Sequence, residues 1–176
     1  MTTRRLRLAA YSTFAWVVVF DAFHVYWELG GRFGFGDQAD PLPGDDTAVK
    51  RILGGIILAL FILGTALPLA LVQPWGRRIP RWALVTMAWV AAGLLTVRAV
   101  AAFIDDAMRT LFGSATGLSG LTYEQLLGTA NPSAYTLWSA RAIDTYFFAG
   151  GVLYATTAWL AGRRRPPAGD RAVPGA

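Results

Sequence analysis

Long apolar runs, separated by short polar stretches, make up most of the chain. A helix that crosses a bilayer needs about 20 predominantly apolar residues, and four stretches reach that length. They cover residues 8–29, 48–72, 82–104 and 134–161. The pattern therefore predicts an all-α fold, a bundle of four transmembrane helices in one membrane domain over residues 1–176, with an Arg- and Pro-rich tail at 162–176.

Residues that begin and end helices separate these runs. They include Gly30-Gly31 after the first run, Asp45-Asp46-Thr47 as N-caps of the second, Pro74, Gly76 and Pro80 as a tight turn, and Asn131-Pro132 as the N-cap and first residue of the fourth. Between the third and fourth runs, Thr122 and Gln125 have the spacing of a capping box, and Gly128 fits a helix stop. We therefore expect a short surface helix in this loop.

Composition narrows the chemistry. The chain is 55% hydrophobic and only 15% charged, with one histidine and no cysteine. A chain without cysteine forms no disulfide, iron–sulfur cluster or thiolate nucleophile. The sequence also contains no glycine-rich nucleotide loop, no nucleophile elbow and no cluster of metal ligands. We therefore expect a protein that uses no metal and no cofactor.

The distribution of charge predicts the topology. Ten of the 16 basic residues lie before the first run, between the second and third runs, or in the tail. Seven of the 11 acidic residues lie in the other two loops. Because cytoplasmic loops carry the excess of lysine and arginine, we predict a multi-pass protein of the cell (plasma) membrane with both termini cytoplasmic. Topology and anionic lipid head groups explain the net charge of +5, so nucleic-acid binding is not expected.

Ionisable residues inside the runs are the most informative feature. They are Asp21, His24 and Glu28 in the first run, Arg98 in the third with Asp105 directly at its end, and Arg141 and Asp144 in the fourth. A charge at mid-bilayer costs about 2.5–3.5 kcal/mol on insertion scales, so these groups must face one another or water. At 100° per residue the members on each helix share a face, and the i, i+3 spacing allows Arg141 and Asp144 to pair.

The rise of 1.5 Å per residue places these groups in the outer half of the bilayer. The sequence therefore predicts a polar pocket that opens to the exterior. The candidate catalytic residues are Asp21, His24, Glu28 and Asp144, and the candidate binding residues are Arg98, Arg141, Trp27, Asp105 and Tyr146. His24 is either a proton shuttle or a neutral hydrogen-bonding residue. Alternatively, the charges form a structural ion-pair network that fixes helix register.

Three segments resemble a known family. They are His24-Val25-Tyr26-Trp27-Glu28-Leu29-Gly30-Gly31, Arg98-Ala99-Val100, and Ala140-Arg141-Ala142-Ile143-Asp144-Thr145-Tyr146. Together they are similar to a family of small four-helix integral membrane proteins of bacteria, common in actinobacteria and called domain of unknown function 3995. The resemblance implies a four-helix membrane fold and supports the choice of candidate residues. It implies no activity.

Two functions remain open at this point. The first is binding of a small amphipathic or lipid-like molecule, with or without cofactor-free acid–base chemistry such as cyclisation, isomerisation or epoxide opening. The second is a non-catalytic accessory subunit or a proton-coupled transport subunit. Both have the lipid bilayer as a partner, and neither predicts a particular oligomeric state.

Overall fold

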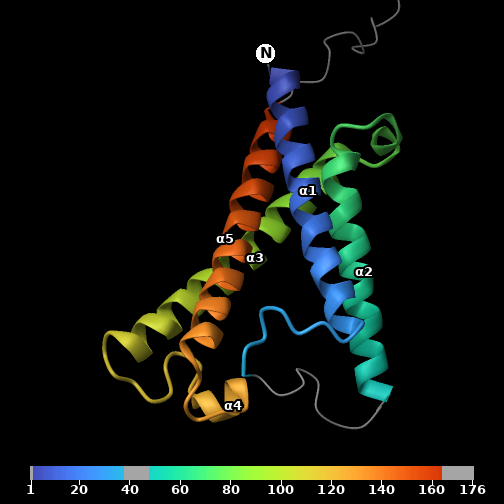
Figure 1. Ribbon diagram of the computed structural model, residues 1–176. Coiled ribbons are helices and arrows are strands. Elements are labelled where there is room, and N and C mark those ends of the chain that lie inside the picture. Colours follow the sequence, from blue (N-terminus) through green and yellow to red (C-terminus); the bar gives the residue numbers. More distant parts are fainter. Residues whose placement is uncertain (1, 38–47, 164–176) are drawn as a thin grey trace, which may run out of the picture.

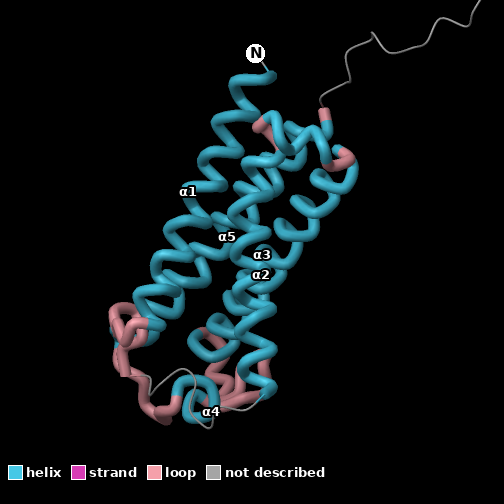
Figure 2. Tube along the Cα trace, turned by 90° about the vertical axis from the view of Figure 1, so that its right-hand side faces the viewer, coloured by secondary structure: helices cyan, strands magenta, loops and turns pink. Residues whose placement is uncertain are grey.

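The computed structural model describes residues 2–37 and 48–163, and every element in them is helical. The elements are α1 (Thr2–Glu28), α2 (Ala48–Ala70), the 3-10 helix η1 (Pro74–Arg78), α3 (Arg81–Thr110), α4 (Tyr123–Leu127) and α5 (Ala134–Gly162). The four long helices alternate in direction, and each begins within six residues of a predicted apolar run (Figure 1). The start of α1 and η1 lie at one end of the molecule, and α4 lies at the other (Figure 2).

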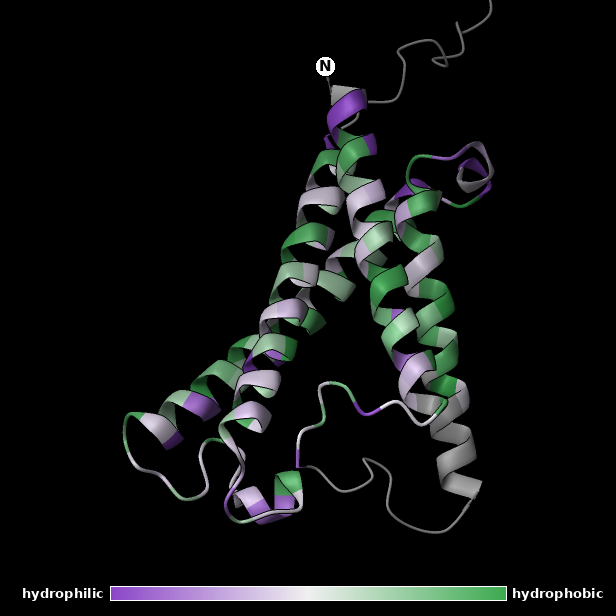
Figure 3. Cartoon of the chain, viewed as in Figure 1, coloured by the Kyte–Doolittle hydropathy of each residue, from purple (hydrophilic) through white to green (hydrophobic). Residues whose placement is uncertain are grey.

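Two of these helices are long and apolar enough to cross a membrane. They cover Arg4–Trp27, whose most apolar 18 residues have a mean hydropathy of 1.4, and Arg81–Thr110, where the corresponding value is 1.9. The described apolar part of α2 is shorter, Leu58–Ala70. Helix α5 has 29 residues but is not one of these two candidate spans, and it carries Arg141, Asp144 and several hydroxyl side chains. Figure 3 shows hydrophobic residues in the middle of the long helices and hydrophilic ones toward both ends of the molecule.

The predicted helix caps are confirmed for α4 and wrong for α5. Thr122 and Gln125 form both hydrogen bonds of the capping box of α4, and Gly128 ends that helix with a φ of 73°. The predicted cap of α5 at Asn131-Pro132 is wrong, because Ser133 is the N-cap and its side chain accepts from the Thr136 amide. The predicted turn over residues 74–80 contains η1. The proposed caps at residues 45–47 and the tail from residue 164 lie outside the described residues.

Small residues hold the long helices together. Ala92 and Ala99 are buried on α3, and Gly151 of α5 faces α3, since a Cβ atom there would lie 3.3 Å from the Ala92 carbonyl oxygen. Small side chains allow two backbones to approach closely, which favours van der Waals packing between helices. The contact between α3 and α5 is the most extensive in the fold, and it fixes how the polar faces of these two helices meet.

Helix α1 joins α5 through an aromatic pair. The Trp16 indole donates to the Tyr146 carbonyl oxygen at 3.0 Å, and the Tyr146 hydroxyl donates to the Trp16 carbonyl oxygen. Their rings stack with centroids 4.8 Å apart. A second bond of 2.9 Å joins the buried hydroxyls of Thr13 and Thr157. These contacts satisfy polar groups that would otherwise be costly to bury.

Candidate functional site

Three ion pairs lie along α3 and its interface with α5. Arg98 Nη1 is 2.5 Å from Asp144 Oδ1. Arg141 donates from Nε and Nη2 to the two oxygens of Asp106, each at 3.0 Å. Arg109 Nε is 2.6 Å from Asp105 Oδ2, one turn earlier on the same helix.

The structure thus brings together four of the predicted site residues from two helices, although with different partners. The expected pair of Arg141 with Asp144 on one helix is not formed, because each of the two side chains reaches across to α3. The reason is geometric, since the small residues between α3 and α5 hold the two backbones close enough for side chains to span the interface. Each arginine therefore bonds to a carboxylate that the i, i+3 spacing did not indicate.

Arg109 organises the loop that follows α3. Its side chain is almost fully buried, with a relative exposure of 3%. Besides Asp105, it donates to the carbonyl oxygens of Ala115, Thr116 and Leu121 and to the Ser119 hydroxyl. Its guanidinium carbon also lies 4.7 Å from the centre of the Tyr123 ring in α4. One arginine thus fixes the loop and α4 relative to the end of α3.

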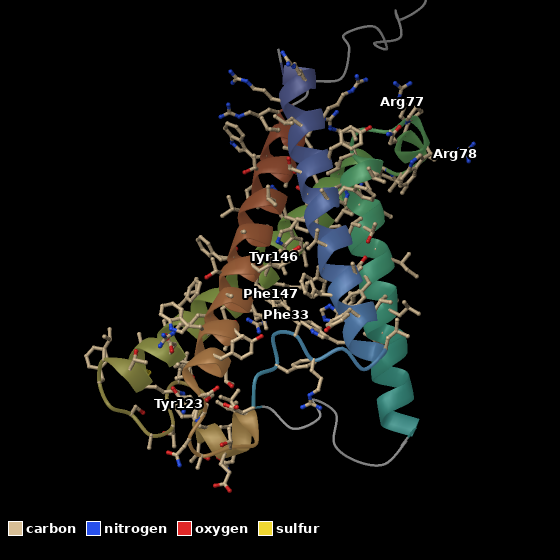
Figure 4. All side chains as sticks on the ribbon, viewed as in Figure 1. Phe33, Arg77, Arg78, Tyr123, Tyr146 and Phe147 are labelled. Carbon is tan, nitrogen blue, oxygen red and sulfur yellow. The ribbon has the colours of Figure 1, made fainter. Side chains whose placement is uncertain are left out.

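All of these charged side chains except Arg98 line a cavity between α3, α4 and α5, with a volume of about 330 Å³. Figure 4 shows Tyr123 of α4 at this end of the molecule, beneath α5. The apolar residues of the lining are Ala101, Ala102, Leu118, Leu126, Leu127, Leu137 and Ala140. The charged residues are Asp105, Asp106, Arg109, Arg141 and Asp144. The cavity is therefore amphipathic, because both apolar and ion-paired residues line it.

The charges in and beside the cavity balance. Asp105, Asp106 and Asp144 each bond to one arginine, so the local formal charge is zero. A neutral or zwitterionic polar group fits the pairs of Arg109 and Arg141 better than a free ion, which would have to displace a carboxylate from arginines that already bond through two or more nitrogens. The described residues contain no group of three or more His, Asp and Glu side chains arranged to hold a metal ion.

The predicted site residues of α1 form a separate group. Asp21 Oδ2 accepts a hydrogen bond of 2.8 Å from Thr65 of α2, whereas its buried Oδ1 accepts none from the described residues. His24 Nδ1 lies 2.9 Å from the Phe20 carbonyl oxygen. A carbonyl oxygen only accepts, so we assign the imidazole hydrogen to Nδ1. Neither Asp21 nor His24 is among the residues that line the cavity.

Trp27 and Tyr146, two of the predicted binding residues, donate hydrogen bonds to backbone carbonyl oxygens. The Trp27 indole donates to the Phe33 carbonyl oxygen at 2.9 Å. Tyr146 bonds to Trp16, as described above, and Figure 4 shows it beside Phe147 in the space between α5 and α1. The side chain of Glu28 lies outside what the structure describes. The candidate residues are thus divided between an α1 group and the cavity.

Asp37, Asp106 and Arg109 were not among the predicted site residues. Asp105 and Arg109 have the i, i+4 spacing of a helical ion pair, and this spacing would have identified Arg109. Asp37 accepts from the Ser133 amide at 2.7 Å and from the Thr136 hydroxyl at 2.9 Å. Its partners are more than 95 positions away, so no local pattern indicates this contact.

Asp37 ties the loop after α1 to the start of α5, and this contact is sensitive to acid. Hydrogen bonds from Ser133, and then from Thr136, lower the pKa of Asp37 below its ordinary value of 3.8. A lowered pKa stabilises the contact above pH 3.8, and the stabilisation is lost as the pH falls through the folded-state value. We expect hydrogen exchange at residues 29–37, corrected for intrinsic rates, to rise only below pH 3.8.

The control for this effect is Asp37→Asn, whose side chain does not ionise. Its loop should exchange faster than the parent loop at neutral pH and should show no further change below pH 3.8. An acid-dependent rise of the same size in the variant would assign the effect to another group.

A family model described as "Protein of unknown function (DUF3995)" matches residues 17–108. The match includes the segments His24–Gly31 and Arg98–Val100, and it ends before Ala140–Tyr146. No curated protein and no solved structure matches the chain. Since the matched residues make up more than half of the chain and include the second part of α1, all of α2 and most of α3, the protein belongs to the DUF3995 family of proteins of unknown function.

Proposed function

We propose that the protein is a multi-pass membrane protein of the cell membrane, in which α1, α2, α3 and α5 form a four-helix bundle with both termini in the cytoplasm. Large apolar side chains face outward on α2 and α3, among them Leu60, Leu94 and Val97. A bilayer would cover such a surface, which is unfavourable in water. Arg77 and Arg78 project from η1 at the same end as the N-terminus, in agreement with the positive-inside rule (Figure 4).

In this orientation the cavity between α3, α4 and α5 lies at the exterior side, and we propose that it binds the polar end of a small amphipathic molecule. The observation that carries the proposal is the division of its lining into apolar residues and ion pairs. Ligand pockets are mostly apolar with a few convergent polar groups, and volumes of about 300–1,000 Å³ are usual. The volume of about 330 Å³ fits a small ligand or one part of a longer one.

The arrangement favours binding over acid–base catalysis. A general base needs a free lone pair within reach of the proton that it removes. Asp106 accepts from Arg141 with both of its oxygens, and Asp105 accepts from Arg109 with both of its own. Each of these oxygens keeps a second lone pair, but both carboxylates are held by an arginine through both of their oxygens. Asp144 bonds to Arg98 through one oxygen, so it is the carboxylate best placed for proton transfer.

The test is to fill the cavity and measure what the protein retains. Ala140→Phe places a ring in the lining, whereas Ala149→Phe places the same ring on an exposed part of α5. We expect small molecules that co-purify with the protein in nanodiscs, measured by mass spectrometry, to fall about tenfold in Ala140→Phe and to stay constant in Ala149→Phe. Identical sets of compounds in both variants and the parent would contradict the proposal.

The second candidate function is a purely structural network of ion pairs. The hydrogen bonds that engage the guanidinium of Arg109 favour it. The pair of Arg141 and Asp106 separates the two candidates, because its side chains remain about one-third exposed. The double variant Arg141→Gln/Asp106→Asn keeps hydrogen bonding and removes both charges. A stable variant that no longer retains the ligand supports binding, whereas loss of thermal stability without loss of ligand supports the network.

A further inference from the structure

A second hollow, of about 320 Å³, lies between α2, η1 and α3. We call it the α2–α3 groove. Its lining is almost entirely apolar and includes Leu60, Leu63, Leu67, Leu84, Met87 and Leu94. It runs along α3 from Leu84 to Leu94, which at 1.5 Å per residue is about 15 Å. It has no charged residue in its lining.

Arg98 continues the lining stripe of α3. Leu84, Met87, Ala91 and Leu94 follow one another at intervals of three and four residues, and Arg98 is the next position in that series. Residues with this spacing share one face of a helix. The residues of α3 that line the cavity begin one turn later, at Ala101. Arg98 therefore stands between the apolar groove and the ion-paired cavity on a single face of α3.

The guanidinium of Arg98 is only partly engaged. It donates through Nη1 to Asp144 and stacks over the Phe147 ring at 4.0 Å. Nε and Nη2 have no hydrogen bond to any residue that the structure describes, and the side chain is 46% exposed. The other arginines of the cavity use two or more nitrogens each. Within a bilayer, an open edge of a guanidinium is costly unless a polar group covers it.

We propose that the α2–α3 groove and Arg98 bind a single-chain anionic amphiphile, with its apolar chain in the groove and its anionic head on the open edge of Arg98. The inference rests on the proposed membrane position of the helices. It names the class of ligand that binds to this face of α3, which also lines the cavity. Guanidinium groups bind carboxylates and phosphates through two parallel hydrogen bonds, which is the match that Nε and Nη2 offer.

The size of the groove favours one chain over two. Its volume is at the lower end of the range for ligand pockets, and its length suits a single extended chain. A phospholipid would have to leave its second chain outside the groove. The head group would then lie beside Asp144, next to the cavity, where a longer polar end could continue toward the ion pairs.

The experiment uses the full chain in nanodiscs of phosphatidylcholine and a palmitic acid that carries a photoactivatable diazirine on its chain. We expect saturable labelling of α2 and α3 residues of the groove, mapped by peptide mass spectrometry. Unlabelled palmitic acid should compete, and its methyl ester, which has no negative charge, should compete at least tenfold less well. Labelling that does not saturate would mean that the groove holds only bulk lipid, and it would overturn the proposal.

Variants test the head group and the groove separately. Arg98→Gln/Asp144→Asn removes both charges but keeps a hydrogen-bonding pair, and we expect at least a tenfold loss of affinity for the probe. Arg98→Lys keeps the positive charge. It is the control that separates a loss of probe binding from a loss of folding. Ala91→Phe fills the groove and should abolish labelling of α2. Full binding by the uncharged double variant would overturn the assignment of Arg98.

The outcomes distinguish this inference from the proposed function of the cavity. Ala140→Phe changes the cavity and leaves the groove intact, so labelling of the groove should persist in it. Saturable labelling confined to the α3–α4–α5 cavity would overturn the groove proposal and support the cavity. Labelling of the groove that a phospholipid displaces better than palmitic acid would overturn the single-chain assignment.

Discussion

Replacement of Gly151 by leucine should be among the most destabilising single changes in this protein. A Cβ atom at Gly151 would lie 2.4 Å from Thr96 Oγ1, 3.2 Å from the Thr96 amide nitrogen and 3.3 Å from the Ala92 carbonyl oxygen. Backbone atoms of α3 cannot rotate away as a side chain can. The larger residue must therefore push α3 and α5 apart, and overpacking of this kind costs about 1–3 kcal/mol or more.

Gly150 provides a second test, because it faces α1 instead of α3. A Cβ atom there would lie 2.3 Å from the Trp16 indole. Gly150→Leu should therefore disrupt the contact with α1, including the stacking of Trp16 on Tyr146. Thermal unfolding in detergent, followed by circular dichroism, measures both effects. The matched control is Gly93→Leu on α3, because no described atom lies within 4 Å of a Cβ at Gly93.

The two glycine variants should differ in their effect on the ion pairs. Separation of α3 from α5 in Gly151→Leu should weaken the bonds of Arg98 to Asp144 and of Arg141 to Asp106, which both span that interface. Gly150→Leu should leave them intact, since its clash is with α1. An unfolding midpoint of Gly151→Leu equal to that of Gly93→Leu would contradict the close approach of the two helices.

Local signals along the sequence predicted much of this fold. The lengths of the apolar runs predicted the four long helices, and the pattern of Thr122, Gln125 and Gly128 predicted α4 together with its caps. These features depend on neighbours a few residues apart. The apolar run also predicted the start of α5 at Ala134, but its cap was misplaced, because the cap is Ser133, whose amide also bonds to Asp37 from a distant loop.

The site was predictable only in part, because side-chain pairing depends on how each helix is rotated about its axis. The cost of burying charge in a membrane indicated that Arg98, Arg141 and Asp144 must find polar partners. Which partner each one finds depends on the contact of Ala92 with Gly151, which brings α3 against α5. Helical periodicity places residues on a face but does not say which neighbouring helix that face meets, so the separation of Asp21 from the cavity was not foreseen.

Loss of Arg109 is the other change with a large expected effect. Arg109→Gln would leave Asp105 without its arginine and remove donors from three carbonyl oxygens of the loop. Breaking a buried pair by removing one partner costs about 3–5 kcal/mol. We expect a lower unfolding midpoint and faster hydrogen exchange at residues 111–122.

Lysine should not replace this arginine. Arg109 bonds through Nε, Nη1 and Nη2 in different directions, whereas a lysine presents one ammonium group. Arg109→Lys should therefore recover little of the protection from exchange, although it keeps the positive charge beside Asp105. Arg78→Gln is the control, because Arg78 is an exposed residue of η1 at the other end of the molecule. Full protection of the loop in Arg109→Lys would mean that charge alone holds it.

The same variant links the loop to the proposed ligand. Ser119 and Tyr123 line the cavity, and Arg109 positions both through its bond to the Ser119 hydroxyl and its contact with the Tyr123 ring. Arg109→Gln should therefore lose the compounds that Ala140→Phe loses, while palmitic acid should still label the α2–α3 groove. If Arg109→Gln retains those compounds although its loop exchanges freely, the compounds bind elsewhere. The cavity would then be only a by-product of the ion pairs that shape the end of α3.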